Sequence, residues 1–219
     1  MLHTETVEGT TLELLRRLQS ESMLDSFCLA GGTALALYLG HRKSIDLDLF
    51  TPYPFDVLLL KDFLETKYGF RTDFLEKNTL KGSINGVKID CITHAYERLE
   101  NPCMEDVVAM KLSAIADNGS RLKDFIDIAF LSTRLSFYSM LKCYERKFPK
   151  SNVIRPFKAI TYFDDIDFDE SIIMLSGTYD WKHIEKRLLE MVGKQDKIFE
   201  SFPLKKKSVS PRKGNGLKL

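Results

Sequence analysis

A glycine pair followed at a fixed distance by two alternating aspartates constrains this chain more than any other feature of its 219 residues. The apolar run Phe27–Ala30 ends at Gly31-Gly32, and thirteen residues later comes Asp46-Leu47-Asp48-Leu49. An apolar run that meets two glycines predicts a buried strand entering a tight turn. Residues two apart on a strand point the same way, so we expect the two aspartates to lie side by side on one face.

The stretch around this motif predicts a strand, a helix and a second strand. Thr33 is expected to cap a helix over residues 34–39 that ends at Gly40, and residues 45–50 alternate as a half-buried strand does. Adjacent carboxylates repel unless a cation or proton intervenes, and Mg²⁺ takes oxygen ligands while leaving room for substrate phosphates. The glycine turn lets a phosphate approach the backbone, toward which the next helix directs its N–H groups.

A third carboxylate follows on a separate apolar strand. In residues 87–92, Val87, Ile89 and Cys91 share one face, so Asp90 lies on the opposite face. A buried acid is costly without a partner, which makes Asp90 a candidate to join the other two aspartates at a metal. An Asp-x-Asp triplet alone is more often a solvated strand face; the glycine turn and the third acid favour the metal site.

The rest of the chain predicts a small mixed sheet flanked by helices, an α+β class, with a helical C-terminal region. The expected domains are a core at 1–137, a helical region at 138–203 and a basic, disordered tail at 204–219. The expected further elements are a helix at 10–24, a helix at 55–68, strands at 70–76 and 81–93 that turn at Asn85-Gly86, and helices at 104–116 and from 120 to about 136. Residues 138–200 are expected to be mostly helical, interrupted by a loop at 149–156 and an acidic stretch at 164–170.

Charge and cysteine usage limit the function classes. The tail segment 205–219 carries six of the 32 basic residues and no acid, which leaves 26 basic against 31 acidic residues elsewhere, a net charge of −5. The body is therefore not a general nucleic-acid binder, and the tail is either an RNA contact or a solubilising segment. Four scattered cysteines, the absence of CxxC, a polar N-terminus and the lack of a long apolar run predict a cytoplasmic protein without a membrane partner.

The glycine pair, the spacing and the aspartates together resemble the signature of the polymerase-β-type nucleotidyltransferases. More narrowly, Gly-Gly-Thr-Ala-Leu-Ala-Leu and the run Gly40–Phe50 resemble the AbiEii/AbiGii toxin family. That family has a lysine on a helix, which Lys111 matches. It also has a helix with the pattern Arg/Lys-Asp-x-x-Asp, which is matched by Lys123-Asp124-Phe125-Ile126-Asp127. Residues 159–165 resemble a further element of the family. Lys123 stands where Arg is common in the family, so the charge is kept but the bidentate fork is lost.

The resemblance implies transfer of a nucleoside monophosphate from an NTP to an acceptor hydroxyl, with an RNA 3′ end, tRNA above all, as acceptor. It implies a toxin with a cognate antitoxin protein. Two Mg²⁺ ions, or Mn²⁺, would be held by Asp46, Asp48 and Asp90, with Lys111 at the triphosphate and Asp124 also functional. Asp127 is interpreted as structural, paired with a nearby base.

Several alternatives stay open from the residues themselves. Lys111 by residue type is a solvated surface lysine, and Arg42 and Ser44 either meet the triphosphate or belong to a plain loop. The candidate nucleotide-binding set is Gly31, Gly32, Thr33, Arg42, Ser44 and Lys111. No role is assigned to His41. The competing functions are a non-catalytic protein that binds a target or antitoxin, an NTP phosphotransferase, and nucleotidylation of a protein or small molecule.

Overall fold

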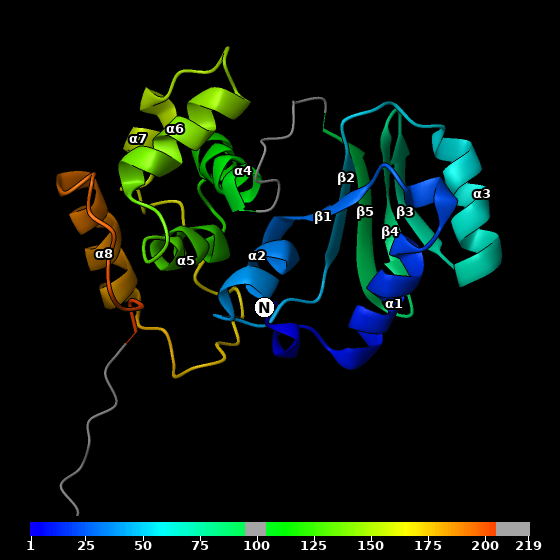
Figure 1. The fold of residues 1–219 in the computed structure, drawn as a ribbon, viewed down its shortest axis with the longest axis horizontal. Helices are drawn as coiled ribbons and strands as arrows, with labels where there is room; N and C mark the ends of the chain where they lie inside the picture. The colour runs from blue at the N-terminus through cyan, green and yellow to red at the C-terminus, as the bar shows by residue number, and fades with distance from the viewer. Residues whose placement is uncertain (95–103, 205–219) are drawn as a thin grey trace, which may run out of the picture.

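The computed structural model describes residues 1–94 and 104–204, and its centre is a five-stranded mixed sheet (Figure 1). The strands are β1 (Cys28–Ala30), β2 (Leu47–Thr51), β3 (Arg71–Glu76), β4 (Thr79–Ile84) and β5 (Val87–Thr93). Their order is β1-β2-β5-β4-β3; β2 and β5 run parallel, and the other neighbours are antiparallel. The expected α+β class is confirmed.

Alternation along the strands divides the sheet into two unlike faces. Leu47, Leu49, Ile89 and Cys91 point to one face, where they join a buried cluster with α1 (Gly9–Gln19) and α3 (Val57–Tyr68). Both helices lie beside the strands in Figure 1. The intervening residues of β2 and β5 point to the opposite face. The apolar side chains therefore leave the acids of these strands on the face away from α1 and α3.

The other helices form a second buried cluster beside the sheet, at the left of Figure 1. They are α2 (Gly31–Leu39), α4 (Met104–Asp117), α5 (Leu122–Leu131), α6 (Phe137–Lys147), α7 (Ile154–Ala159) and α8 (Trp181–Gly193). Helices α4 and α5 pack here with the helices that follow them. The domain boundary after residue 137 remains a prediction. Buried residues from before and after it belong to the same apolar cluster.

A helix ends and a hairpin turns at the residues that the sequence predicts. Gly40 ends α2 with a φ of +64°, a conformation that costs glycine little. Asn85 and Gly86, with φ of +50° and +82°, join β4 to β5, as the Asn-Gly hairpin signal requires.

Some element bounds differ from those that the sequence predicts. Helix α1 ends at Gln19, before a 3₁₀ turn at Ser22–Leu24, and α5 ends at Leu131. After residue 138, the expected acidic interruption at 164–170 lies within a longer irregular segment, residues 160–180, and the expected loop at 149–156 includes the start of α7. In that segment the Ile173 carbonyl accepts from Lys43 N, and Leu175 N donates to the His41 carbonyl. These hydrogen bonds pair backbone groups of the segment that no helix pairs, and they attach the segment to the residues before β2.

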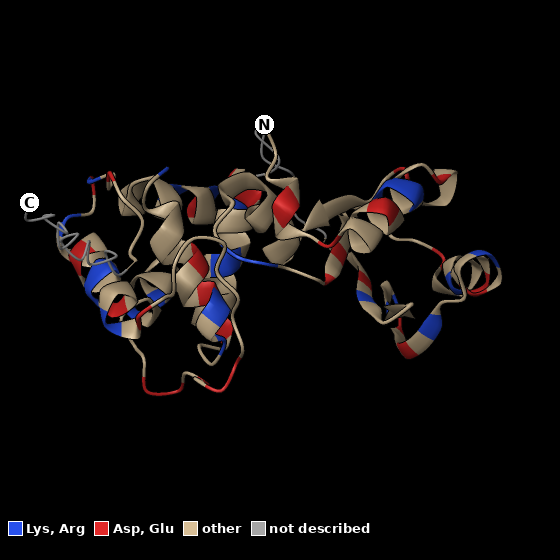
Figure 2. Ribbon diagram, turned by 90° about the horizontal axis from the view of Figure 1, so that it is seen from below, with Lys and Arg blue, Asp and Glu red and all other residues tan. Residues whose placement is uncertain are grey.

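No helix among the described residues is both long and apolar enough to cross a membrane. Figure 2 shows acidic and basic residues interspersed over strands and helices alike, in keeping with the body's small net charge. The tail 205–219 lies outside the described residues.

Candidate functional site

Two of the expected carboxylates are direct neighbours across the sheet. Asp48 of β2 pairs in register with Asp90 of β5, and both side chains are half-buried. Burial, followed by the negative charge of Asp90, raises the pKa of Asp48, and Asp46 adds to the rise. Negative charge therefore accumulates at this point of the sheet.

Asp46 is not part of the strand, contrary to the sequence expectation. Strand β2 begins at Leu47, so Asp46 lies in the loop that leads into it. A buried threonine fixes this loop: the Thr33 hydroxyl donates to the backbone carbonyl of Asp46 and lies 2.8 Å from Ser44 Oγ. Tertiary contacts rather than strand alternation thus place Asp46.

The expected helix cap at Thr33 is wrong for the same reason. Helix α2 begins two residues earlier, at Gly31, with Ala30 as N-cap and no side-chain capping bond. Thr33 is therefore already inside the first turn, and its hydroxyl is used to hold the Ser44–Asp46 loop. Its role is to position the neighbouring acid.

The two glycines make room for side chains of the site. Gly31 has a φ of +64°, and a Cβ there would overlap the Asp48 carboxylate. At Gly32 a Cβ would lie 2.6 Å from Nη2 of Arg42. The expectation was close approach by a phosphate; in this structure the space next to the backbone accommodates Asp48 and Arg42.

A pocket of about 270 Å³ opens beside these residues. It is lined by the start of α2, by residues 42–46 and Asp48, by Arg121 and Lys123 at the start of α5, and by residues 170–173. Asp90, Lys111 and Asp124 are not among its lining residues. The pocket thus combines carboxylates, cations and a helix N-terminus, the groups that a metal-bound triphosphate needs.

Beneath the pocket, Asp127 ties together three basic residues. Its carboxylate accepts from Nε and Nη2 of Arg42 at 2.7 and 2.9 Å and from Nε2 of His41 at 2.7 Å, and it pairs with Nζ of Lys111 at 2.8 Å. All four residues are buried. Although burial alone raises it, the charges of Arg42 and Lys111 hold the pKa of Asp127 well below its usual value. The structural interpretation of Asp127 agrees with this geometry.

Lys111 lies between two acids and is not the surface lysine that its residue type suggests. It forms ion pairs with Asp124 and Asp127 and is buried. Burial lowers its pKa, but the charges of Asp127 and Asp124 outweigh burial and raise it. Lys111 is therefore protonated, and its charge lowers the pKa of Asp48. A role for Lys111 and Asp124 in substrate binding stays a prediction.

Sequence reasoning missed several residues of the site. His41 is a buried partner of Asp127. Glu170 lines the pocket and pairs with Nζ of Lys123 at 2.7 Å. Lys81 of β4 pairs with Asp90 at 2.8 Å, which supplies the partner that an acid in a central strand needs. The acid run around Glu170 was visible in the sequence, but its neighbour was not, because 47 positions separate Glu170 from Lys123.

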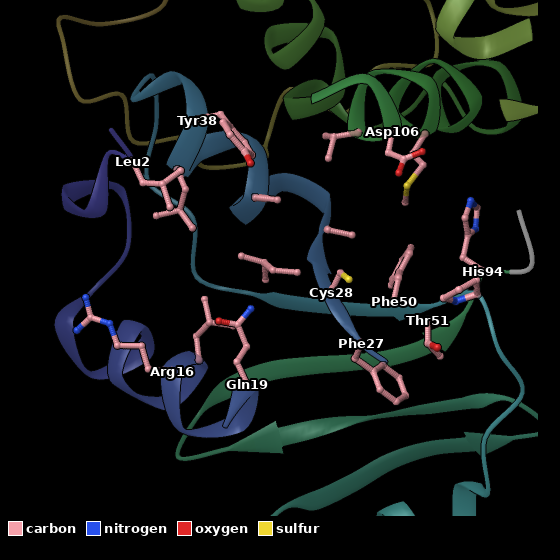
Figure 3. A pocket seen from close by; sticks show the side chains of 18 of the residues that line it. Leu2, Arg16, Gln19, Phe27, Cys28, Tyr38, Phe50, Thr51, His94 and Asp106 are labelled. Carbon is pink, nitrogen blue, oxygen red and sulfur yellow. The ribbon is translucent and has the colours of Figure 1, made fainter. Parts of the chain in front are cut away.

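A second, more apolar pocket of about 410 Å³ lies between α1, α2, β1 and α4 (Figure 3). His94, Asp106 and Lys147 line one part of it. In Figure 3 Asp106 and His94 lie at one side, while Arg16 and Gln19 lie across from them. Asp46, Asp48 and Asp90 are not among its lining residues, whereas Asp46 and Asp48 line the smaller pocket.

Comparison with known proteins finds a family model and a relative that each match most of the chain. A family model described as nucleotidyl transferase AbiEii toxin, type IV toxin–antitoxin system, matches residues 13–101 and 102–202. An uncharacterized protein of Aquifex aeolicus (strain VF5) is 32% identical over 168 residues, which are 70% of this chain and 81% of that protein. The stretches matched by the family model contain the glycine pair, the three aspartates and the residues of the Lys111–Asp127 network.

A CCA-adding enzyme solved with CTP aligns with 74% of this chain at 16% identity and a TM-score of 0.36. The chain spans about half, 52%, of that structure, and a likeness of this size says nothing about substrates. The family model matches most of the chain. The chain belongs to the nucleotidyl transferase AbiEii toxin family of type IV toxin–antitoxin systems.

Proposed function

We propose that this protein transfers a nucleoside monophosphate from an NTP to the 3′ end of an RNA, with tRNA as the favoured acceptor, and that it acts as the toxin of a toxin–antitoxin pair. The observation that carries the proposal is the pairing of Asp48 with Asp90 across β2 and β5, next to a pocket entered by the N-terminus of α2. Carboxylates, helix N–H groups and cations converge there.

The pocket suits the triphosphate. Gly32 and Thr33 belong to the first turn of α2, whose free N–H groups favour an anion. Arg121 is half exposed, and it lines the same pocket as Lys123. Arg42 also lines it but is engaged with Asp127, so we assign it to holding the loop before Asp46. Arg121 and Lys123 are the cations proposed to meet the phosphates.

The carboxylates fit Mg²⁺ as its ligands. Within residues 1–94 and 104–204, no group of three His, Cys, Asp or Glu side chains is arranged to hold a metal ion by itself. Mg²⁺ is commonly held by one or two carboxylates plus substrate phosphates. The pKa of Asp48 is raised first by burial and then by the negative charge of Asp90, which a cation would offset. Asp46, Asp48 and Asp90 are the proposed ligands; the bound ions would polarise the phosphoryl oxygens.

The transfer step balances as a single displacement. The acceptor hydroxyl oxygen bonds to the α-phosphorus while the bond from that phosphorus to the bridging oxygen of pyrophosphate breaks. Asp90 orients the attacking hydroxyl and takes its proton, and pyrophosphate leaves with the electron pair of the broken bond. Lys111, held protonated by Asp124 and Asp127, offsets the charge that develops on the leaving group.

One labelling experiment separates this proposal from its alternatives. Purified protein is incubated with total RNA, Mg²⁺ and each NTP, labelled once on the α-phosphate and once on the γ-phosphate. We expect α-label in RNA and none with Asp48→Asn. Transfer of γ-label would instead indicate a phosphotransferase, and α-label in protein or a small molecule would overturn the RNA acceptor. Binding of Mg²⁺ and NTP without any transfer would indicate a non-catalytic member of the family.

A further inference from the structure

A row of side chains crosses the sheet from the metal-binding carboxylates to its far edge. The register pairs Asp48 with Asp90, Asp90 with Lys81, and Lys81 with Phe74 of β3, which is the edge strand. Residues paired across neighbouring strands point to the same face. Phe74 and Lys81 therefore lie on the face that carries Asp48 and Asp90.

A β-bulge is what puts Phe74 on this face. The pairing shifts between Thr72 and Phe74: Thr72 pairs with Gly82, and Phe74 pairs with the very next residue of β4, Lys81. Thr72 faces α3, because its hydroxyl donates to Glu65 of that helix at 2.9 Å. In a regular strand Phe74 would point the same way as Thr72. The extra residue redirects it to the opposite face, a use of bulges that is common beside active sites.

Phe74 places a large apolar side chain on this face. It is 47% exposed, although burial of a phenylalanine ring stabilises a fold by roughly 1.5 to 3 kcal/mol. Leu75, the next residue of β3, pairs with Leu80 on the other side of the sheet and is 41% exposed. The edge strand is thus open to solvent on both sides, and Phe74 presents its ring on the carboxylate side, two strands away from Asp90.

Cations accompany the ring on the same face. Lys81 pairs with Asp90 while its side chain is 41% exposed. Lys88 and Arg71 both pair with Ser83, two residues from Lys81, and both are exposed. Glu76 of the next row and Asp73 within the bulge are acidic, so this face is mixed in charge. An aromatic contact is therefore expected to contribute more here than charge does.

We infer that Phe74 and Lys81 form the platform for the acceptor, on which the 3′-terminal base of a single-stranded RNA stacks and its phosphate meets the lysine. This inference rests on the proposed function and names the acceptor side of the same site. Stacking on an exposed ring is how single-stranded nucleic acids are held without sequence preference. The donor pocket at α2 and α5 lies on the other side of Asp48, so the row places acceptor and NTP on opposite sides of the carboxylates.

The test measures RNA binding apart from chemistry, with an oligonucleotide that ends in a single-stranded 3′ stretch. Phe74→Leu keeps an apolar side chain, Phe74→Tyr restores a ring, and Tyr138→Leu removes a similarly exposed ring from α6 as the matched control. We expect Phe74→Leu to weaken RNA binding by about five- to a hundred-fold, the range for loss of one stacked base. Phe74→Tyr and Tyr138→Leu should bind like the wild type, and NTP affinity should be the same in all four proteins.

A second arm tests the lysine. Lys81→Gln should reduce the slope of log affinity against log salt by about 0.7, the share of one phosphate contact on a single strand. If wild type labels RNA but Phe74→Leu binds and labels it equally well, the platform is wrong while the proposed function stands. If wild type binds NTP but neither binds nor labels any RNA, both are wrong. A loss of NTP affinity in Phe74→Leu would also overturn the platform, because it would indicate a general disturbance of the site.

Discussion

Asp48 on the sheet is half-buried and Asp127 on α5 is fully buried, and the surroundings of the two carboxylates shift their pKa values in opposite directions. Asp127 has two bonds from Arg42, one from His41 and an ion pair with Lys111, and its pKa is held far below the usual value. Asp48 has two acids for neighbours and a raised pKa. A carboxylate that is paired with basic side chains of the same chain stabilises the fold. A carboxylate whose neighbours are other acids is available to bind a cationic ligand.

The same difference gives the two aspartates opposite effects on stability as pH changes. A depressed pKa such as that of Asp127 contributes stability that is present above the ordinary value near 3.8 and is lost as pH falls through the depressed pKa. A raised pKa such as that of Asp48 means that the folded state binds the proton more tightly than the unfolded chain. Its ionisation therefore costs stability as pH rises from about 3.8 through the raised pKa.

The largest effect is expected at Asp127. Asp127→Ala leaves His41, Arg42 and Lys111 without their shared partner in the interior, and unpaired buried charge costs about 3 to 5 kcal/mol. Urea unfolding at neutral pH measures the loss. Asp117→Ala is the matched control, because Asp117 is an exposed acid with a single arginine partner. Equal unfolding midpoints for Asp127→Ala and Asp117→Ala would show that Asp127 does not stabilise the fold more than an exposed acid does.

Gly31→Ala should come next. The positive φ and the overlap with Asp48 each oppose a side chain there, and strain of this kind costs about 1 to 3 kcal/mol. Gly69→Ala is the control, since Gly69 has a φ of +66° but nothing within 4 Å of an added Cβ. Gly31→Ala should lower the free energy of unfolding by more than Gly69→Ala does, and the excess is the cost of the overlap with Asp48. Adding Asp48→Ala to Gly31→Ala removes that overlap and should restore the excess. No recovery in the double variant would show that the methyl group does not meet the Asp48 carboxylate.

Asp48→Asn should separate function from stability. The amide removes a charge that the fold does not satisfy, so the free energy of unfolding at neutral pH should rise by about 0.5 to 2 kcal/mol. Nucleotide transfer should fall to background, because an amide is a poor ligand for Mg²⁺ beside Asp90. Thermal unfolding and α-label transfer measure the two effects on one preparation. If Asp48→Asn is inactive and also less stable than the wild type, Asp48 stabilises the fold as Asp127 does.

The smallest effect concerns the acid limb of the pH profile. Protonation of Asp48 should begin at a higher pH than for an ordinary aspartate, because burial and Asp90 raise its pKa. Activity should therefore fall during acidification while Asp127, whose pKa is depressed, still supports the fold. Transfer rate and circular dichroism followed over the same pH series test this order. Coincident loss of both signals would contradict it.

Features set by neighbouring residues were predictable from the sequence. The alternation that puts Asp48 and Asp90 on the face opposite to the apolar side chains follows from the period of a strand, and both strands are present. The hairpin at Asn85-Gly86 and the helix end at Gly40 follow from positive φ, which these residues adopt at low cost. The family followed from the same short motifs.

The start of β2 and the role of Thr33 were not predictable, because alternation continues into the loop that holds Asp46. The strand begins where pairing with β5 begins, at Leu47, and Thr33, eleven to thirteen positions away, holds the loop before it. The bulge that redirects Phe74 leaves no mark in the apolar pattern of β3, whose residues are nearly all exposed.

The sequence by itself determined that Asp48 and Asp90 lie opposite the apolar side chains of their strands, and which family the chain belongs to, since both depend on spacing over short stretches. Tertiary structure alone decided which charges are satisfied. Asp127 meets His41 and Arg42 across 86 and 85 positions, and Lys81 meets Asp90 because β4 lies next to β5. Ion pairs form between whatever groups packing brings within a few ångströms, and local periodicity carries no information about that distance.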